Sequence, residues 1–319
     1  MSARRPSRWA RLLTESRNPR SRRLDALSTE RAVALLLDED RRALVAAARE
    51  RRPIARAARM AADALDSGGD VVLLGAGTSG RLAVLEAAEC PPTFGTDPRR
   101  VRAVMAGGHE SVFASREGAE DREDLGREEG ERLGGRDLLV GISASSVTPF
   151  VRGALEAARG RGASTVLVTC APGRGLARLA DVVIAVRSGP EVLTGSTRLK
   201  AGSATKAVLN AISTAAMVRL GKAYENLMVD LRPTSAKLVD RTKRIVGAAT
   251  GLGDAESARL LEASAGEVKT AIVMSKLNVT PEEARSRLAH ARGHVRAAIG
   301  GSTRGAKPPS SKRKRRTGR

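Results

Sequence analysis

The chain has 319 residues, of which 41 % are hydrophobic and 2 % aromatic, so a core must be built mainly from aliphatic side chains. We find no apolar run of the ~20 residues that a membrane helix needs, and no apolar segment behind the basic N-terminus, so we expect neither a membrane span nor a secretory signal. Two cysteines and three histidines without ligand spacing predict a reduced, cytoplasmic protein that holds no metal.

The formal net charge of +21 is concentrated at the two ends of the chain. Residues 1–23 are predicted to form a basic N-terminal arm. Residues 301–319, which end in SSKRKRRTGR, are predicted to be a disordered basic tail. A solvated charge run is the first interpretation of this tail, and a contact with nucleic acid is the second.

The first element is a helical stretch over 24–69, capped by Ser28 or Thr29, interrupted at Pro53 and ended by Gly68 and Gly69. Short apolar runs rich in Val, Ile and Leu then alternate with helical segments, a pattern typical of a doubly wound parallel sheet in an α/β fold, flavodoxin-like in order. The five predicted strands are 70–75, 101–107, 137–145, 164–170 and 181–186, and the helices between them are 79–90, 115–133 and 149–160.

A helical pattern returns from Ser196 to about Val246. Beyond it, we expect a small subdomain of three short helices, with Thr280 as the N-cap and Pro281 as the first residue of the last helix.

Three loops rich in glycine and hydroxyl groups follow predicted strands: GAGTSG (75–80), SASSVTP (143–149) and GPEVLTGSTRLK (189–200). Ligands of open parallel sheets bind at the carboxyl ends of the strands, where helix N-termini attract phosphate. A dinucleotide site needs an acid at the end of the second strand, but that strand ends in MAGGHE, and no GK[ST] is present for a Walker A loop. The loops therefore favour a compact phosphate ligand, although any one of them alone could be an ordinary turn.

Glu89 precedes Cys90 and two prolines, at the expected C-terminal end of its helix. The negative end of the helix dipole would raise the pKa of a carboxyl there, which suits a proton donor. Glu86, one turn earlier, could equally be a surface residue. The acidic run over 116–124 lies near a helix start, where acids are favourable, so these physical arguments alone do not single out Glu120.

Four long motifs in the correct order resemble the N-acetylmuramic acid 6-phosphate etherase family, whose members are sugar isomerase (SIS) domain enzymes. They are GAGTSGRLAVLEAAECPPTFG, EGAED, GPEVLTGSTRLKAGSATKAVLN and NLMVDL, and the resemblance runs from about Leu24 to Ile299. It implies cleavage of the lactyl ether to N-acetylglucosamine 6-phosphate and D-lactate, in cell-wall recycling and without a cofactor. It also implies a SIS domain over 24–246, a helical subdomain over 247–300, and a homodimer in which each site is completed by the partner.

The resemblance identifies Glu89 in AAEC and Glu120 in GAED as two catalytic carboxylates. One would remove the C2 proton of the ring-opened sugar, and the other would protonate the departing lactate oxygen. We assign Glu89 as the acid and Glu120 as the base, with the reverse left open. The 6-phosphate would be held by Thr78, Ser79, Gly80, Ser145, Ser146, Thr148 and Ser196.

The second loop departs from the family's usual ASGRTP, because Ser146 stands in place of the glycine and Val147 in place of the arginine. Arg81, Arg198 or Lys200 would have to supply the missing positive charge. This change keeps one alternative open, a non-catalytic SIS sensor of sugar phosphates. An aldose–ketose isomerase on the same fold is another alternative, which the paired glutamate motifs disfavour.

Overall fold

The computed structural model describes residues 12–171, 173–231 and 236–300. By their contacts, the residues group into two compact units, one of Met1–Leu220 with Asp230–Arg232 and another of Gly221–Val229 with Pro233–Arg319. The domain boundaries expected from the sequence stay predictions. The C-terminal basic tail lies outside the described residues.

The first unit is built on a five-stranded parallel sheet with the strand order β2-β1-β3-β4-β5. In register, Val71 of β1 lies opposite Val101 of β2 and Leu138 of β3. This order, with a crossover after each strand, confirms the predicted doubly wound sheet. The strands are β1 (Val71–Gly75), β2 (Val101–Met105), β3 (Leu138–Ile142), β4 (Ser164–Thr169) and β5 (Val182–Ala185).

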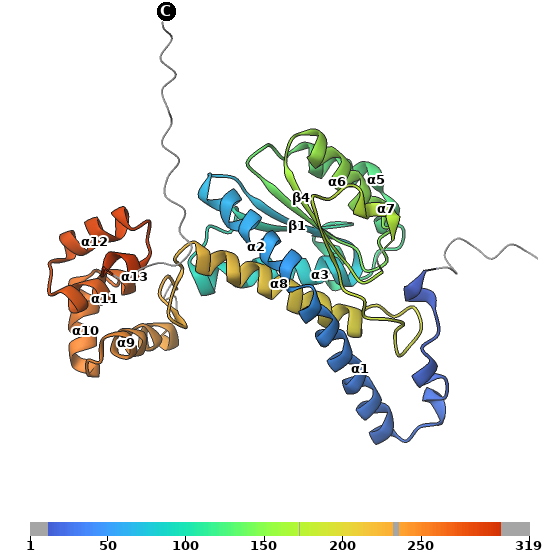
Figure 1. The fold of residues 1–319 in the computed structure, drawn as a ribbon, viewed down its shortest axis with the longest axis horizontal. Coiled ribbons are helices and arrows are strands. Elements are labelled where there is room, and N and C mark those ends of the chain that lie inside the picture. Colours follow the sequence, from blue (N-terminus) through green and yellow to red (C-terminus); the bar gives the residue numbers. More distant parts are fainter. Residues whose placement is uncertain (1–11, 172, 232–235, 301–319) are drawn as a thin grey trace, which may run out of the picture. The chain divides into compact units, whose positions relative to one another are not determined.

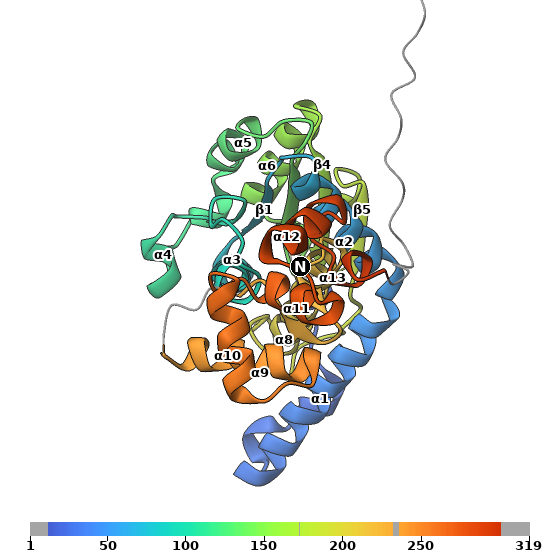
Figure 2. The same cartoon turned by 90° about the vertical axis from the view of Figure 1, so that its left-hand side faces the viewer.

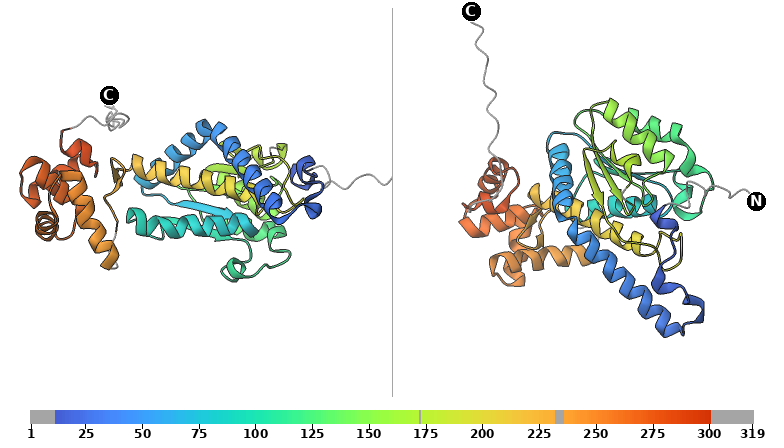
Figure 3. Two further views of the ribbon diagram at one scale, coloured as in Figure 1. Left: turned by 90° about the horizontal axis from the view of Figure 1, so that it is seen from below. Right: turned by 45° about the vertical axis from the view of Figure 1, so that its right-hand side comes forward.

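Helices cover both faces of the sheet, as Figures 1 and 3 show. Because successive strand residues point to opposite faces, Val71 and Leu73 pack with the helices of one layer while Val72 and Leu74 pack with those of the other. The first layer holds α2 (Arg51–Asp66), α3 (Gly77–Phe94) and α8 (Lys200–Arg219). The second holds α6 (Pro149–Gly160), α7 (Arg174–Ala177) and, packed on α6, α5 (Glu123–Glu131).

The first long helix, α1 (Thr29–Arg49), begins at Ser28, whose hydroxyl accepts a hydrogen bond from Arg31 N at 3.3 Å, so the predicted cap is confirmed. Its N-terminal part extends away from the sheet (Figure 1). The interruption falls at Glu50 rather than Pro53, because Pro53 lies in the first turn of α2, where no backbone N–H is needed.

The predicted end of the helix after β1 is wrong. Helix α3 continues through Pro91 and Pro92 to Phe94 and ends at Gly95, which has a positive φ of 64°. Each proline removes one i→i−4 hydrogen bond and crowds the carbonyl of residue i−4, but Phe94 at the end of the helix is buried in the core, and this packing outweighs that cost.

Two other predicted helices are shorter than expected. The run 115–133 contains the 3₁₀ turn η5 (Ala119–Asp121) and α5, with the short helix α4 (Glu110–Phe113) before it at the rim of the unit (Figure 2). The run 196–246 is divided between α8 and the start of α9 (Ala236–Thr250) by an antiparallel hairpin of β6 (Ala223–Tyr224) and β7 (Leu227–Met228). The sequence analysis missed this hairpin.

The second unit carries α9 and the predicted three short helices, α10 (Asp254–Ala263), α11 (Val268–Leu277) and α12 (Pro281–His290), followed by the single turn α13 (Val295–Ala298). Thr280 caps α12 by accepting a hydrogen bond from Glu283 N at 3.3 Å, and Pro281 is its first residue, as predicted.

The described part of the basic N-terminal arm is ordered into three short 3₁₀ turns, η2 (Leu13–Glu15), η3 (Pro19–Ser21) and η4 (Leu24–Ala26). These residues pack on the third loop. Asn18 Nδ2 donates to Pro190 O at 3.1 Å, Ser21 Oγ donates to Val192 O at 2.7 Å, and Gly195 N donates to Thr14 O at 3.1 Å. Across the described ranges, no helix has the length and apolar content required to span a membrane.

Candidate functional site

The first two hydroxyl-rich loops follow the adjacent strands β1 and β3, whose last residues Gly75 and Ile142 lie opposite each other. The third loop follows β5 and leads into α8. Thr78 of the first loop lies beside the first turn of α8, since a Cβ built on Gly202 would be 3.7 Å from its methyl carbon. The fold therefore places all three loops at the carboxyl edge of one sheet and brings the first against the end of the third.

The first loop forms the N-terminus of α3 rather than a separate turn. Thr78 and Ser79 lie in its first turn, half-buried, and the N-cap residue Ala76 offers no side-chain acceptor to the free N–H groups. Gly80 is buried, and a Cβ there would be 2.7 Å from Gly75 O, so the tight passage from strand to helix requires glycine. This is a suitable position for an anion.

In the second loop, the hydroxyls of Ser143 and Thr148 are 2.8 Å apart, so Thr148 is engaged within the protein. Ser145 is half-buried. Ser146 has a φ of 62°, a left-handed conformation that favours glycine, and its Oγ is buried without a hydrogen-bond partner. The glycine expected from the family pattern would fit this backbone better. In the third loop, Ser196 is half-buried and its carbonyl accepts from Leu199 N at 3.2 Å.

A cavity of about 280 Å³ adjoins the first loop. Gly77 and Arg81 of α3 form one side, and Glu117 and Glu120 form another. Arg81 donates from Nε to Val112 O at 2.8 Å and from Nη2 to Ser111 O at 2.9 Å, so its guanidinium holds α4 against α3. The cavity therefore unites Glu120, an exposed carboxylate, with the loop that could hold phosphate.

Ser111 is a cavity residue that the sequence analysis missed. It is 2 % exposed and its Oγ has no hydrogen-bond partner. The only available sequence signal was its position shortly after Gly107 and Gly108, the two glycines that follow β2.

Glu89 does not line this cavity. It is exposed on α3, eight residues after Arg81, which corresponds to ~12 Å along the helix axis. Since α3 runs on to Phe94, Glu89 precedes the last turn, so the helix dipole no longer marks it as a proton donor, because that effect is confined to the terminal turn. Within one chain, the two predicted carboxylates thus do not share a pocket.

Glu86, which the sequence left as a possible surface residue, is buried between α3 and α8. Burial raises the pKa of its carboxyl, partly offset by a hydrogen bond from Ser213 Oγ and by the charge of Lys206.

Of the three cations that could replace the arginine missing from the second loop, Arg81 is held by backbone carbonyls and Lys200 by Glu39, with Nζ 2.5 Å from Oε2. Arg198 is exposed, and within 12–171, 173–231 and 236–300 it has no hydrogen bond or ion pair. In the same ranges, no group of three or more histidine, cysteine, aspartate or glutamate side chains could hold a metal ion.

The parallel sheet with phosphate-type loops at its carboxyl edge defines a SIS-domain protein, and family models agree. The model described as glucokinase regulatory protein N-terminal SIS domain matches residues 53–159, and the SIS domain model matches residues 127–215. A solved protein from Escherichia coli CFT073 is a distant likeness, with a TM-score of 0.44 and 20 % identity over 63 % of this chain and 97 % of that chain.

The chain belongs to the N-acetylmuramic acid 6-phosphate etherase family. A relative of that name from Rubrobacter xylanophilus is 50 % identical over 92 % of this chain and 97 % of its own length. Relatives of the same name from Geobacillus sp. and Salmonella agona are 45 % and 47 % identical, over 91 % and 90 % of this chain and 99 % and 98 % of theirs.

Proposed function

We propose that this enzyme cleaves the D-lactyl ether of N-acetylmuramic acid 6-phosphate, as a carbon–oxygen lyase of amino-sugar catabolism. The observation that carries the proposal is the identity of 45 to 50 % with etherases over nearly their whole length. The products are N-acetylglucosamine 6-phosphate and D-lactate. No observation favours the alternative of a non-catalytic sensor.

The chemistry requires a base and an acid. In the open-chain sugar, the aldehyde acidifies the proton on C2, and a carboxylate removes it while the C3–O bond to lactate breaks and a carboxylic acid protonates the leaving oxygen. Water then adds to C3 of the double bond and gives its proton to the carboxylate that protonated the lactate, while the other carboxylic acid returns its proton to C2, so the net change is hydrolysis of the ether. We propose Glu89 and Glu120 for these transfers and assign neither role, because Glu89 lies before the last turn of α3.

The phosphate is proposed to lie at the N-terminus of α3, held by the first-turn N–H groups and by Thr78 and Ser79, with hydroxyls of the second loop and Ser196 near it. Arg198 is the proposed replacement for the missing arginine, since its charge is not engaged elsewhere in the described chain. These assignments rest on the burial and contacts given above.

We further propose a cytoplasmic homodimer in which a partner supplies the second carboxylate to each cavity. The separation of Glu89 from the Glu120 cavity within one chain supports this arrangement. So does the apolar stripe of exposed residues on α1, formed by Val33, Leu37 and Leu44. We propose no specific nucleic-acid partner for the basic tail.

The test is release of D-lactate from N-acetylmuramic acid 6-phosphate by the purified chain. Glu89→Gln and Glu120→Gln should each lower kcat by roughly 10²- to 10⁴-fold, the usual contribution of a general acid or base. Glu128→Gln, which neutralises an exposed acid on α5, is the matched control and should leave the rate unchanged. A folded wild type that is thermally stabilised by sugar phosphates but releases no lactate would establish the sensor instead.

A further inference from the structure

A second cavity, of about 470 Å³, lies beside the loop after β5 and shares no lining residue with the one beside Glu120. Three parts of the chain form its walls. They are the N-terminal segment at Asn18–Arg20, the stretch of α1 from Glu39 to Arg49, and the loop after β5 from Arg187 to Pro190, with Lys200 beside them.

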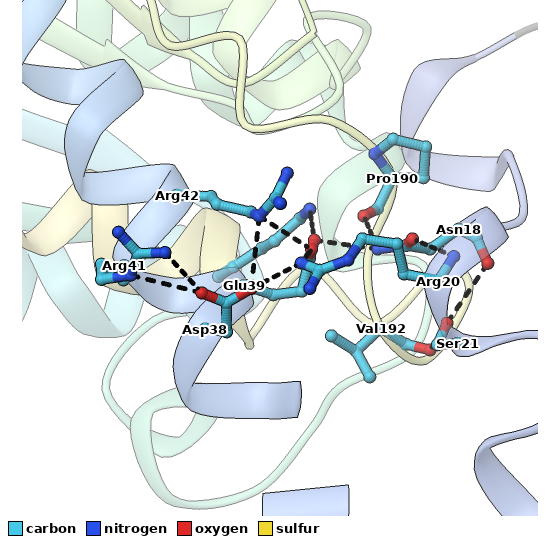
Figure 4. A network of polar contacts seen from close by, with 10 residues as sticks. Asn18, Arg20, Ser21, Asp38, Glu39, Arg41, Arg42, Pro190 and Val192 are labelled. Carbon is cyan, nitrogen blue, oxygen red and sulfur yellow. Dashed lines mark hydrogen bonds and ion pairs between the residues drawn. The ribbon is translucent and has the colours of Figure 1, made fainter. Parts of the chain in front are cut away.

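Six cationic side chains line this cavity, and two carboxylates balance only some of them. Figure 4 shows Asp38 and Glu39 flanked by arginines. Arg20 Nη1 lies 2.7 Å from Asp38 Oδ2 and 2.6 Å from Glu39 Oε1, and Lys200 Nζ also pairs with Glu39. Arg41 and Arg42, three and four residues further along α1, also pair with Asp38.

Arg49 and Arg187 are the two cavity cations that remain unpaired. Both are exposed, and neither makes an ion pair or a hydrogen bond with any other described residue. They approach the cavity from different elements, α1 and the loop after β5. The walls therefore hold a surplus of positive charge.

A guanidinium presents its N–H donors as a planar fork that matches the oxygens of a phosphate. The cavity volume lies within the range of small-molecule sites. No aromatic side chain lines it, so the bases of a single-stranded nucleic acid would have no surface on which to stack. The positive charge of the walls, the volume of the cavity and the absence of aromatic lining residues together favour a compact anion that carries phosphate.

We propose that this cavity is a second ligand site, separate from the cavity beside Glu120, and that it binds a small anion carrying one or more phosphate groups between Arg49 and Arg187. Such an anion joins α1 to the loop after β5, next to the Asn18 hydrogen bonds that hold the N-terminal segment on Glu39 and Pro190. Its binding therefore strengthens the docking of that segment. The proposal does not depend on the etherase activity.

The experiment measures binding of inorganic phosphate and of diphosphate to the full chain by calorimetry, at constant ionic strength set with chloride. Arg49→Gln/Arg187→Gln should weaken diphosphate binding roughly tenfold or more, because each arginine contributes charge-assisted hydrogen bonds. Arg56→Gln/Arg59→Gln removes two exposed arginines of α2 outside the cavity and should bind like the wild type. Without ligand, the melting temperature of the first variant should equal that of the wild type, since neither side chain has a partner to lose.

Three results would overturn the proposal. One is equal diphosphate binding by both double variants, which places the anion at the loops of the candidate active site alone. Another is an equal loss in both, which indicates general attraction to a basic protein. The third is an oligonucleotide that binds more tightly than diphosphate and depends on the same two arginines, which assigns the cavity to nucleic acid.

Discussion

Helix α8 meets a buried glutamate at two places along its length, and the two carboxylates differ in how they are neutralised. At the start of α8, Glu39 of α1 receives Lys200 Nζ at 2.5 Å, Asn18 Nδ2 at 2.9 Å and a bond from Arg20. Burial raises the pKa of Glu39, but these three donors outweigh it, so the pKa lies below its usual value.

Further along α8, Glu86 of α3 has weaker partners. Ser213 Oγ donates to it, and Asn210, with its amide oriented to satisfy both neighbours, donates to Oε2 at 2.6 Å and accepts from Lys206 Nζ at 2.6 Å. Asn210 thus lies between Lys206 and the Glu86 carboxylate, and Lys206 does not pair with it directly. Burial dominates and raises the pKa of Glu86, and the charge of Glu89 adds to the rise.

The difference shows what decides the direction in which the pKa of a buried carboxyl group shifts. A direct cation with additional donors keeps Glu39 ionised, whereas a hydroxyl and an amide do not overcome the loss of water around Glu86. The first region binds the N-terminal segment, α1 and α8 into one structure. The second leaves a proton-accepting group three residues from a proposed catalytic glutamate.

Removing one partner of the Glu39 network should have the largest effect on stability. Glu39→Ala leaves Lys200 buried without its counter-ion, and we expect a loss of ~3–5 kcal/mol in the free energy of unfolding, measured by urea denaturation followed by circular dichroism. The double variant Glu39→Leu/Lys200→Met removes both charges and should recover most of that loss. A loss below ~1 kcal/mol for the single variant would show that the network does not hold the region together.

Ser146 extends the comparison to a buried polar group with no partner at all. It is 1 % exposed, with a φ of 62° and an unbonded Oγ. Ser146→Gly removes the backbone strain and the unsatisfied hydroxyl, partly offset by the greater entropy of glycine in the unfolded chain, so we expect a gain of ~1 kcal/mol. Ser146→Ala removes only the hydroxyl and should be less stable than the glycine variant. A thermal melt that places both below the wild type would contradict this account.

Much of the fold could be predicted because it depends on local pattern. The strands differ from prediction by a few residues at their ends, and α6 was placed over 149–160 as observed. The features that were predicted wrongly or not at all depend on tertiary packing. Proline was expected to end α3, but the helix continues to Phe94, which is buried in the core. The docking of Asn18 on Pro190 joins residues 172 positions apart, for which the sequence holds no local signal.

In the candidate site, too, some features follow from local sequence pattern and others from tertiary packing. The loops at the carboxyl edge follow from the order of strands, and the sequence located them. The burial of Glu86 and the exposure of Glu89 depend on which face of α3 meets α8, and that face is set by tertiary contacts. The prediction that Glu89 is the acid depends on a helix end at residue 90, whereas α3 ends at Phe94.

The smallest expected effect is a difference in pH dependence between Glu86 and Glu39. Because the pKa of Glu86 is raised above its ordinary value of 4.5, the folded state holds its proton more tightly than the unfolded chain. The stability that this group contributes is then complete below about pH 4.5 and is lost as the pH rises through the folded pKa. Glu86→Gln does not titrate, so its stability relative to the wild type should increase with pH above 4.5.

Glu39 should behave in the opposite way. Its lowered pKa means that its contribution is present above pH 4.5 and lost as the pH falls through the folded value, so the deficit of Glu39→Gln should shrink on acidification. Urea midpoints of both variants and the wild type between about pH 3 and pH 8 measure the two slopes. If both differences change with pH in the same direction, the partners of the two carboxylates along α8 do not set their charge, and burial alone governs both.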